Sequence, residues 1–126
     1  MITDQEVLHT LLKQLSDDRN TAVEYMEHYL SQENENGAWD GVIYSSETKA
    51  DICSVIINDL FTFLNEGKSP EEAVRGALDN TEHLYSRMMG VSRAGTNIIK
   101  LHISCRQTLL REHLHRMATL HEAVMA

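Results

Sequence analysis

Apolar residues recur three and four positions apart along most of the chain, the spacing that places them on one face of an α-helix. The first stretch consists of Val7, Leu8, Leu11, Leu12 and Leu15. Thr3-x-x-Glu6 precedes it with the spacing of a capping box, so we expect a helix over about residues 4–16. Asp17 or Asp18 can cap a second helix. Its apolar stripe consists of Ala22, Val23, Tyr25, Met26, Tyr29 and Leu30.

Residues 33–45 have two glycines and no sustained period, so they are predicted to form a loop. A third helix, capped by Ser45 or Ser46, is expected over about residues 47–65 and ends before Gly67. Apolar residues surround much of its circumference, which indicates the central and most buried element. These residues are Ile52, Cys53, Val55, Ile56, Ile57, Leu60, Phe61, Phe63 and Leu64.

The segment Ser69-Pro70-Glu71-Glu72 gives the clearest helix start, because it combines an N-cap, a proline at the first helical position and a capping-box glutamate. That fourth helix is predicted to reach about residue 89, with Gly90 as its C-terminal cap. No breaker follows Gly95, so a last helix is predicted from residue 92 or 96 to about residue 124. It would span about 28 residues, or roughly 42 Å. An apolar end that overhangs its bundle needs cover, which a homodimer or a bound partner could supply.

The sequence therefore predicts an all-α fold: a single-domain bundle of about five helices over residues 1–126, with a long C-terminal helix. A chain of 126 residues is long enough for one core. It has no apolar run of the roughly 20 residues that a membrane span needs. The first residues carry acid where a signal peptide carries base, and Cys53 and Cys105 fit reduced thiols in helices. We therefore expect a soluble, cytoplasmic protein.

Charge is divided unevenly along the chain. Residues 1–59 hold twelve acidic and three basic residues, a net charge of −9. Residues 60–126 hold seven acidic and eight basic residues, a net charge of +1, which gives −8 for the whole chain. Between residues 17 and 40, seven carboxylates face only Arg19. A surface of one sign steers basic molecules toward it and repels nucleic acid and anionic lipid. We therefore expect a basic protein partner, with no nucleic acid and no membrane.

Trp39, the single tryptophan of the chain, lies in the predicted loop beside Asp40. Exposed aromatic residues among charges are typical of protein interfaces, and loops often carry function. The alternatives are that Trp39 folds back on the core and that the acidic helix face is an ordinary solvated surface. The predicted partner-binding residues are Glu24, Glu27, Glu33, Glu35, Trp39, Asp40 and Tyr44.

These features favour a non-catalytic protein-binding module. Its most concrete form is an immunity or inhibitor protein that covers the cationic substrate site of a nuclease-like toxin, with capture accelerated by electrostatic complementarity. A small secretion or assembly chaperone is an alternative, and it would use an apolar groove on the long last helix.

Three polar residues interrupt the apolar face of the last helix. His102, Arg106 and His113 point to the middle of this face at 100° per residue. Buried among apolar neighbours they would be costly unless paired, so we expect a carboxylate or backbone carbonyls from another element. Asp59 is the first candidate partner. The cluster could fix the packing register, line a binding or catalytic pocket, or lie at an oligomer interface.

Residues 106–113 also resemble the Arg-x4-6-His signature of HEPN-type helical ribonucleases, because Arg106 is followed by a polar residue and by His113 seven positions on. The resemblance is confined to these eight residues. It implies a small helical bundle with paired active sites across a dimer, in which Arg106 binds the scissile phosphate. His113 would work beside it in metal-free phosphodiester transfer. The acidity of the chain disfavours an RNA substrate.

Other catalytic and metal patterns are weaker. Glu6-x-x-His9 and Glu112-x-x-His115 resemble the Glu-x-x-His pairs of di-iron bundles. Capping already explains Glu6, however, and His115 points away from the apolar face. The sequence has no CxxC pair, no Gly-rich phosphate loop and no nucleophile-elbow glycines. We expect no metal, no cofactor and no enzymatic activity.

Overall fold

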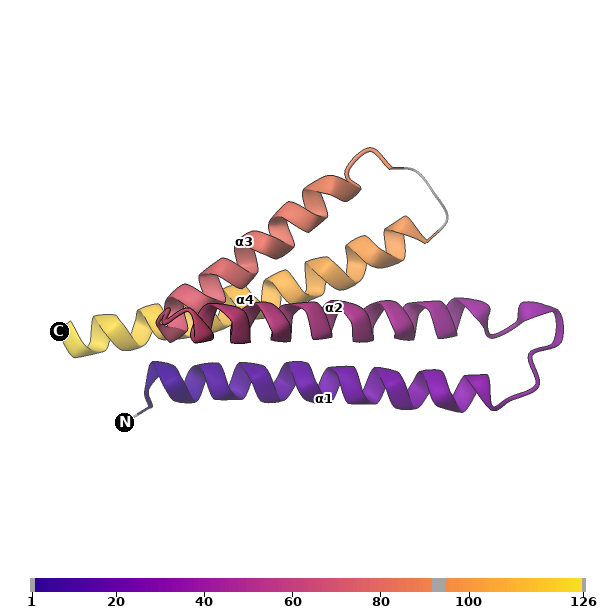
Figure 1. The fold of residues 1–126 in the computed structure, drawn as a ribbon, viewed down its shortest axis with the longest axis horizontal. Coiled ribbons are helices and arrows are strands. Elements are labelled where there is room, and N and C mark those ends of the chain that lie inside the picture. Colours follow the sequence, from indigo (N-terminus) through magenta and orange to yellow (C-terminus); the bar gives the residue numbers. More distant parts are fainter. Residues whose placement is uncertain (1, 92–94, 126) are drawn as a thin grey trace.

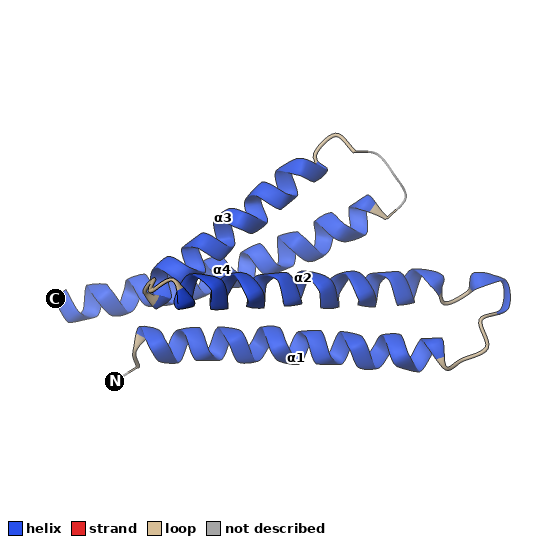
Figure 2. Ribbon diagram, viewed as in Figure 1, coloured by secondary structure: helices blue, strands red, loops and turns tan. Residues whose placement is uncertain are grey.

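The computed structural model describes residues 2–91 and 95–125. It contains the helices α1 (Asp4–Leu30), α2 (Asp40–Asn65), α3 (Pro70–Met88) and α4 (Thr96–Met125), and the short 3₁₀ turn η1 (Glu35–Gly37). Consecutive helices run in opposite directions, and α1 and α2 form a long hairpin from which α3 diverges (Figure 1). Within the described ranges, every regular element is helical (Figure 2). The predicted all-α, single-domain bundle is confirmed.

Helix α1 continues through Asp17 and Asp18, where the sequence pattern predicts a break between two helices. Aspartate inside a helix costs at most about 0.7 kcal/mol relative to alanine, which packing can offset. Leu11, Leu15 and Ala22 are buried on both sides of the expected break. Over residues 2–91 and 95–125 the bundle therefore has four α-helices, and the first two predicted helices are one.

Helix α2 begins at Asp40, about seven residues earlier than the predicted start at residue 47, whose expected cap is Ser45 or Ser46. Its N-cap residue is Trp39, which makes no capping bond through its side chain. The reversal before it uses Asn36 and Gly37, with φ of 56° and 70°. Asparagine and glycine are the residues that most readily adopt this left-handed region. Part of the predicted loop 33–45 is therefore helical.

The turn between α2 and α3 follows the predicted chemistry. Ser69 Oγ accepts a hydrogen bond from Glu72 N at 3.2 Å, and Glu72 Oε1 accepts one from Ser69 N at 3.3 Å. This complete capping box confirms the predicted helix start. Hydrogen bonding to the Glu72 carboxyl, first from the Ser69 side chain and then from the Ser69 backbone, lowers the pKa of this carboxyl below its ordinary value.

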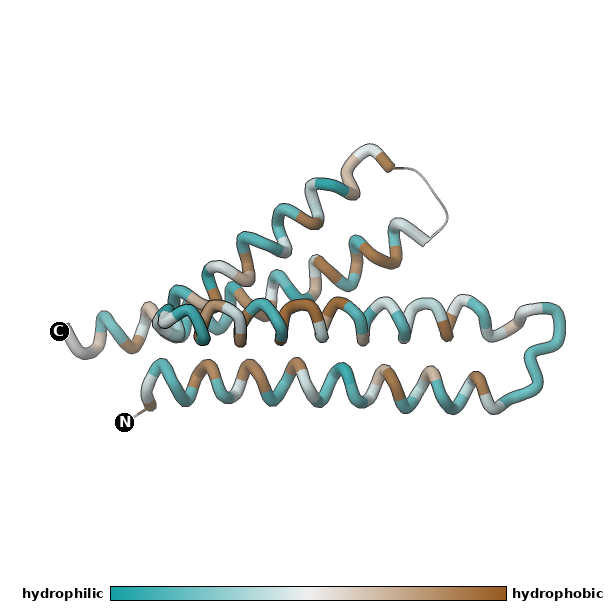
Figure 3. The backbone as a smooth tube through the Cα atoms, viewed as in Figure 1, coloured by the Kyte–Doolittle hydropathy of each residue, from teal (hydrophilic) through white to brown (hydrophobic). Residues whose placement is uncertain are grey.

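The core lies along the bundle axis and receives side chains from all four helices. Its largest fully buried members are Leu11, Leu15, Ile56, Leu60, Ile103, Leu110 and Met117. Hydrophobic positions follow the inner faces of the helices, whereas the connection between α1 and α2 is mainly hydrophilic (Figure 3). Truncating one of these leucines to alanine typically costs about 2–5 kcal/mol, so the core fixes how the helices pack.

Helix α4 begins at Thr96, the later of the two predicted starts, and the earlier one at residue 92 lies outside the described residues. Met117 is fully buried and Leu120 is partly buried against the core. The apolar face of α4 is therefore covered by the other helices of the same chain as far as Leu120. Both termini lie at the same end of the molecule (Figure 1). Among the described helices, none is long and apolar enough to cross a membrane.

Candidate functional site

The predicted partner-binding residues gather at the end of the α1–α2 hairpin that lies away from the two termini (Figure 1). Glu24 and Glu27 come from the last turns of α1, Glu33 and Glu35 from the connection, and Asp40 from the start of α2. All five carboxylates are on exposed residues. We call this end of the molecule, residues 24–44, the acidic hairpin end.

Trp39 is held in place by its own loop. Its indole Nε1 donates to the carbonyl of Glu33 at 3.2 Å, and its backbone N donates to Asn34 Oδ1 at 2.8 Å. The Asn34 amide also donates to Asp40 Oδ1 at 2.8 Å. These bonds tie the connection to the start of α2, so Trp39 and Asp40 are presented in a fixed arrangement.

The Trp39 ring packs on Tyr29 of α1, with the ring centroids 5.0 Å apart. Tyr29 in turn stacks with Tyr25, one helical turn earlier, at 6.5 Å and 15° between planes. The alternative in which Trp39 covers the core is therefore not what the structure shows, because the half-buried ring lies outside the core cluster. We call Tyr25, Tyr29 and Trp39 the aromatic row.

Large apolar side chains are exposed beside the carboxylates. Tyr25 is 55% exposed and Leu30 is 60% exposed. Val42 and Tyr44 are exposed as well. Tyr44 also contacts the start of α4, because a Cβ atom at Gly95 would lie 3.0 Å from its ring. Gly95 has φ of 92°, so this close approach and the backbone conformation both require glycine there.

No protein-family model, curated protein or solved structure matches this chain. Its function is therefore inferred from the side chains of the chain itself.

A second polar cluster lies inside the bundle, between α1, α2 and α4. Arg106 is 11% exposed in its side chain, and its Nη2 lies 3.7 Å from Asp18 Oδ2. Its Nη1 donates to Cys53 Sγ at 3.8 Å, while its buried Nε has no hydrogen-bond partner among the described residues. Burial raises the pKa of the Cys53 thiol, although the Arg106 charge acts in the opposite direction.

His102 lies one helical turn before Arg106 and contacts α2. Its Nε2 is 2.9 Å from Ser45 Oγ. Burial lowers the pKa of the His102 imidazole, and the nearby charges of Arg106 and Lys49 lower it further. The neutral ring is therefore favoured, and it forms a hydrogen bond that links α4 to α2.

His113 is the most buried of the three predicted residues, at 3% exposed. Its Nδ1 lies 2.8 Å from the carbonyl oxygen of Leu109, so Nδ1 carries the proton and donates it. Its Nε2 is buried without a hydrogen-bond partner among the described residues. A phosphate could not reach this ring without the helices separating. The burial of Arg106 and His113 favours a role in packing over phosphate binding.

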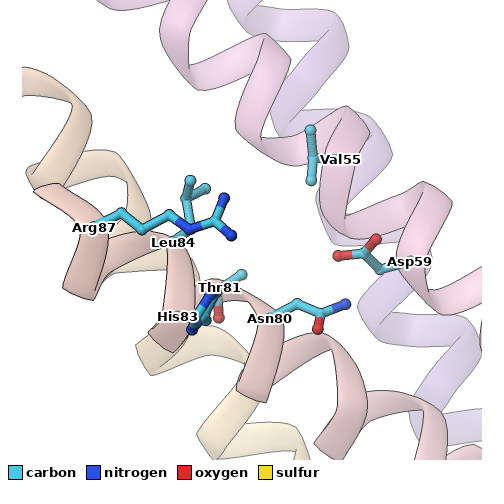
Figure 4. Close-up of a pocket in the computed structure, with 7 residues that line it drawn as sticks. All are labelled: Val55, Asp59, Asn80, Thr81, His83, Leu84 and Arg87. Atoms are coloured by element: carbon cyan, nitrogen blue, oxygen red, sulfur yellow. The ribbon is translucent and has the colours of Figure 1, made fainter.

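Asp59 does not belong to this cluster, which corrects the predicted pairing. Its carboxylate points into a groove of about 260 Å³ between α2 and α3, together with Asn80, His83 and Arg87 (Figure 4). Within the described ranges, no ion pair or hydrogen bond joins Asp59 to His102, Arg106 or His113. Asp59 cannot pair with Arg106 because Asp59 and Cys53 point in different directions around α2: Asp59 faces α3, whereas Cys53 faces α4.

Asp18 is the carboxylate that the sequence reasoning missed. It was assigned to a helix cap, but the spacing of Leu11, Leu15, Asp18 and Ala22 continues one inward-facing stripe. That spacing was the available signal. Over the described part of the chain, no group of three His, Cys, Asp or Glu side chains could hold a metal ion.

Proposed function

We propose that this protein binds a basic partner protein through the acidic hairpin end. The observation that carries the proposal is that exposed carboxylates and exposed aromatic and aliphatic side chains share this one surface. Glu24 and Tyr25 are adjacent on α1, and Glu33 accepts the indole hydrogen bond of Trp39 through its backbone. Interfaces of this composition combine apolar burial with charge complementarity.

The charge of this surface favours a cationic protein. Seven carboxylates against one arginine lie within residues 17–40, and most of them are exposed. Such a field accelerates the encounter with a basic surface, and the acceleration decreases as salt screens it. A nuclease has a cationic substrate site, so an inhibitor that covers such a site is the most specific form of this proposal.

The fixed geometry of the connection also supports binding. Asn34 bonds both to the backbone of Trp39 and to the carboxylate of Asp40. A loop that is already ordered loses less conformational entropy when a partner binds. The exposed Tyr25 and the half-buried Trp39 supply contact area at a small cost in side-chain freedom.

The test is affinity capture of proteins from a lysate of the source organism, followed by elution with a salt gradient. The double variant Glu24→Lys/Glu27→Lys reverses two exposed charges of the surface. Glu112→Lys/Glu122→Lys is the matched control, because it makes the same change in net charge on exposed residues of α4. We expect a basic protein that elutes with salt, is lost with the first variant and is kept with the second.

Two outcomes would contradict the proposal. Partners that resist high salt and bind both variants equally would place the interface elsewhere on the molecule. A wild-type protein that retains no basic protein at low salt would remove the proposed partner class altogether.

A further inference from the structure

The geometry of the aromatic row suits the stacking of a cation on its exposed end. Tyr25 and Tyr29 are nearly parallel, with 15° between their planes, and Tyr29 meets Trp39 at 46°. The faces of aromatic rings carry negative electrostatic potential, so cations placed over them are attracted. Tyr25 ends the row at its most exposed point. At 55% exposed, Tyr25 leaves part of its side chain accessible to a cation of a partner.

The carboxylate residue Glu24 lines a hollow beside the Tyr25 ring. Glu24, Tyr25 and His28 line a hollow of about 190 Å³ on the outer face of α1. A guanidinium group is planar, stacks on aromatic rings and donates paired hydrogen bonds to a carboxylate. An ammonium group on a lysine attracts the same charges but lacks the plane and the fork of donors.

We infer that the hollow beside Tyr25 receives an arginine side chain of the basic partner, whose guanidinium stacks on the tyrosine ring and bonds to Glu24. The inference rests on the proposed function, since it names the chemistry by which the partner is recognised. A site of this kind selects arginine over lysine, although both side chains carry the same charge.

Trp39 provides a readout within the same row. It is the single tryptophan of the chain, so its fluorescence reports on this surface without a label. The probes are nona-arginine and nona-lysine peptides, which carry the same formal side-chain charge. Titrations at 0.15 M salt screen charges beyond about 8 Å, which leaves mainly short-range contacts.

We expect nona-arginine to bind about threefold or more tightly than nona-lysine, in line with the strength of an exposed cation–π contact. Tyr25→Leu should reduce this preference, because only the hydrogen bonds to Glu24 then favour arginine, and it should leave the affinity for nona-lysine nearly unchanged. Phe61→Leu is the matched control, because Phe61 is an aromatic residue of α2 that is 49% exposed, against 55% for Tyr25. This control should keep the preference for arginine.

Equal affinity for the two peptides, or a preference for nona-arginine that Tyr25→Leu leaves undiminished, would overturn the inference. Absence of binding by either peptide would overturn it as well. The proposed function fails on a different result, namely capture that ignores charge reversal at Glu24 and Glu27. A partner that is captured through the acidic surface but shows no arginine preference would therefore contradict only the guanidinium site.

Discussion

Asp18 and Arg106 join the first and last helices of the bundle, with Oδ2 and Nη2 3.7 Å apart. Both residues occupy inward-facing positions between apolar neighbours, Leu15 on α1 and Leu110 on α4. The pair forms a polar layer within a hydrophobic core. Partial exposure of Asp18 lets water reach its carboxylate, whereas the guanidinium is nearly enclosed. The two partners should therefore respond differently to substitution.

Asp18→Asn is expected to lower the free energy of unfolding by about 1–2 kcal/mol, because it leaves a nearly buried cation without its carboxylate. Arg106→Met should change it by less than about 1 kcal/mol, since the new side chain is apolar and Asp18 can be hydrated. Urea unfolding monitored by circular dichroism measures both. A larger loss for Arg106→Met than for Asp18→Asn would show that the guanidinium contributes more by packing than the pair does by charge.

We expect the folded protein to become less stable as the pH rises above about 6.5, because the ion pairs of His121 are then lost. Its Nε2 lies 2.6 Å from Asp4 Oδ2, and its Nδ1 lies 3.5 Å from Glu71 Oε2. The other carboxylate oxygen of Glu71, Oε1, pairs with Arg75. The hydrogen bond to Asp4, followed by the charges of Asp4 and Glu71, raises the pKa of the His121 imidazole. A raised pKa in the folded state stabilises the fold fully below the unfolded value of about 6.5, and this contribution is lost as pH rises through the folded value.

Urea midpoints measured from pH 5.5 to 9 test this contribution. His121→Gln should remove the decrease in stability that begins above about pH 6.5, because glutamine does not titrate. His115→Gln is a control on the same helix, since His115 is exposed and makes no ion pair in the described structure. The same pH slope in His121→Gln and in the wild type would contradict the assignment.

For His102 we expect the opposite dependence of stability on pH. Burial, Arg106 and Lys49 lower the pKa of its imidazole, so between the folded value and about 6.5 the unfolded chain binds a proton that the folded chain does not. Stability should therefore fall as pH decreases below about 6.5. His102→Gln should remove that part of the decrease while keeping a polar group near Ser45. Unchanged acid sensitivity in this variant would show that His102 is protonated as readily in the folded chain as in the unfolded one.

Much of the fold follows from local patterns in the sequence. The capping box at Ser69 and Glu72, the breaker at Gly67 and the apolar spacing of Leu8, Leu11 and Leu15 each predict an element that the structure contains. The helix boundaries that were predicted wrongly are those at which tertiary packing, rather than local sequence, determines whether the helix continues. Asp17 and Asp18 have poor helix propensity, and yet α1 passes through them because its apolar stripe continues on both sides.

The candidate sites show the same division. Periodicity correctly places His113 inside the bundle and Arg106 on an inward-facing position of the same helix, because both positions depend on one helix alone. The pairing of Arg106 with Asp18 could not be predicted from one helix alone, since it depends on how α1 is rotated relative to α4. Composition predicts the acidity of this part of the chain, but the contact of Trp39 with Tyr29 requires the return of the chain at Asn36 and Gly37.

The two thiols should differ sharply in reactivity. Cys53 is fully buried between α2 and α4, and burial raises the pKa of its thiol, whereas Cys105 is exposed on α4. The thiolate is the reactive form, so both the low access and the raised pKa protect Cys53. We expect Cys53 to react with iodoacetamide more slowly than Cys105 by a factor on the order of 100 or more, because it must wait for the helices to open.

Mass spectrometry of the single-thiol variants Cys53→Ser and Cys105→Ser measures each rate separately, and urea provides the unfolded reference in which the two rates should converge. The variant that retains Cys53 also reports on the polar layer. Asp18→Asn combined with Cys105→Ser should expose Cys53 faster, in proportion to the stability that the lost ion pair supplied, if opening is in rapid equilibrium. Comparable labelling of Cys53 and Cys105 in the folded protein would mean that α2 and α4 separate readily at this level, and that the Cys53–Arg106 contact does not hold them together.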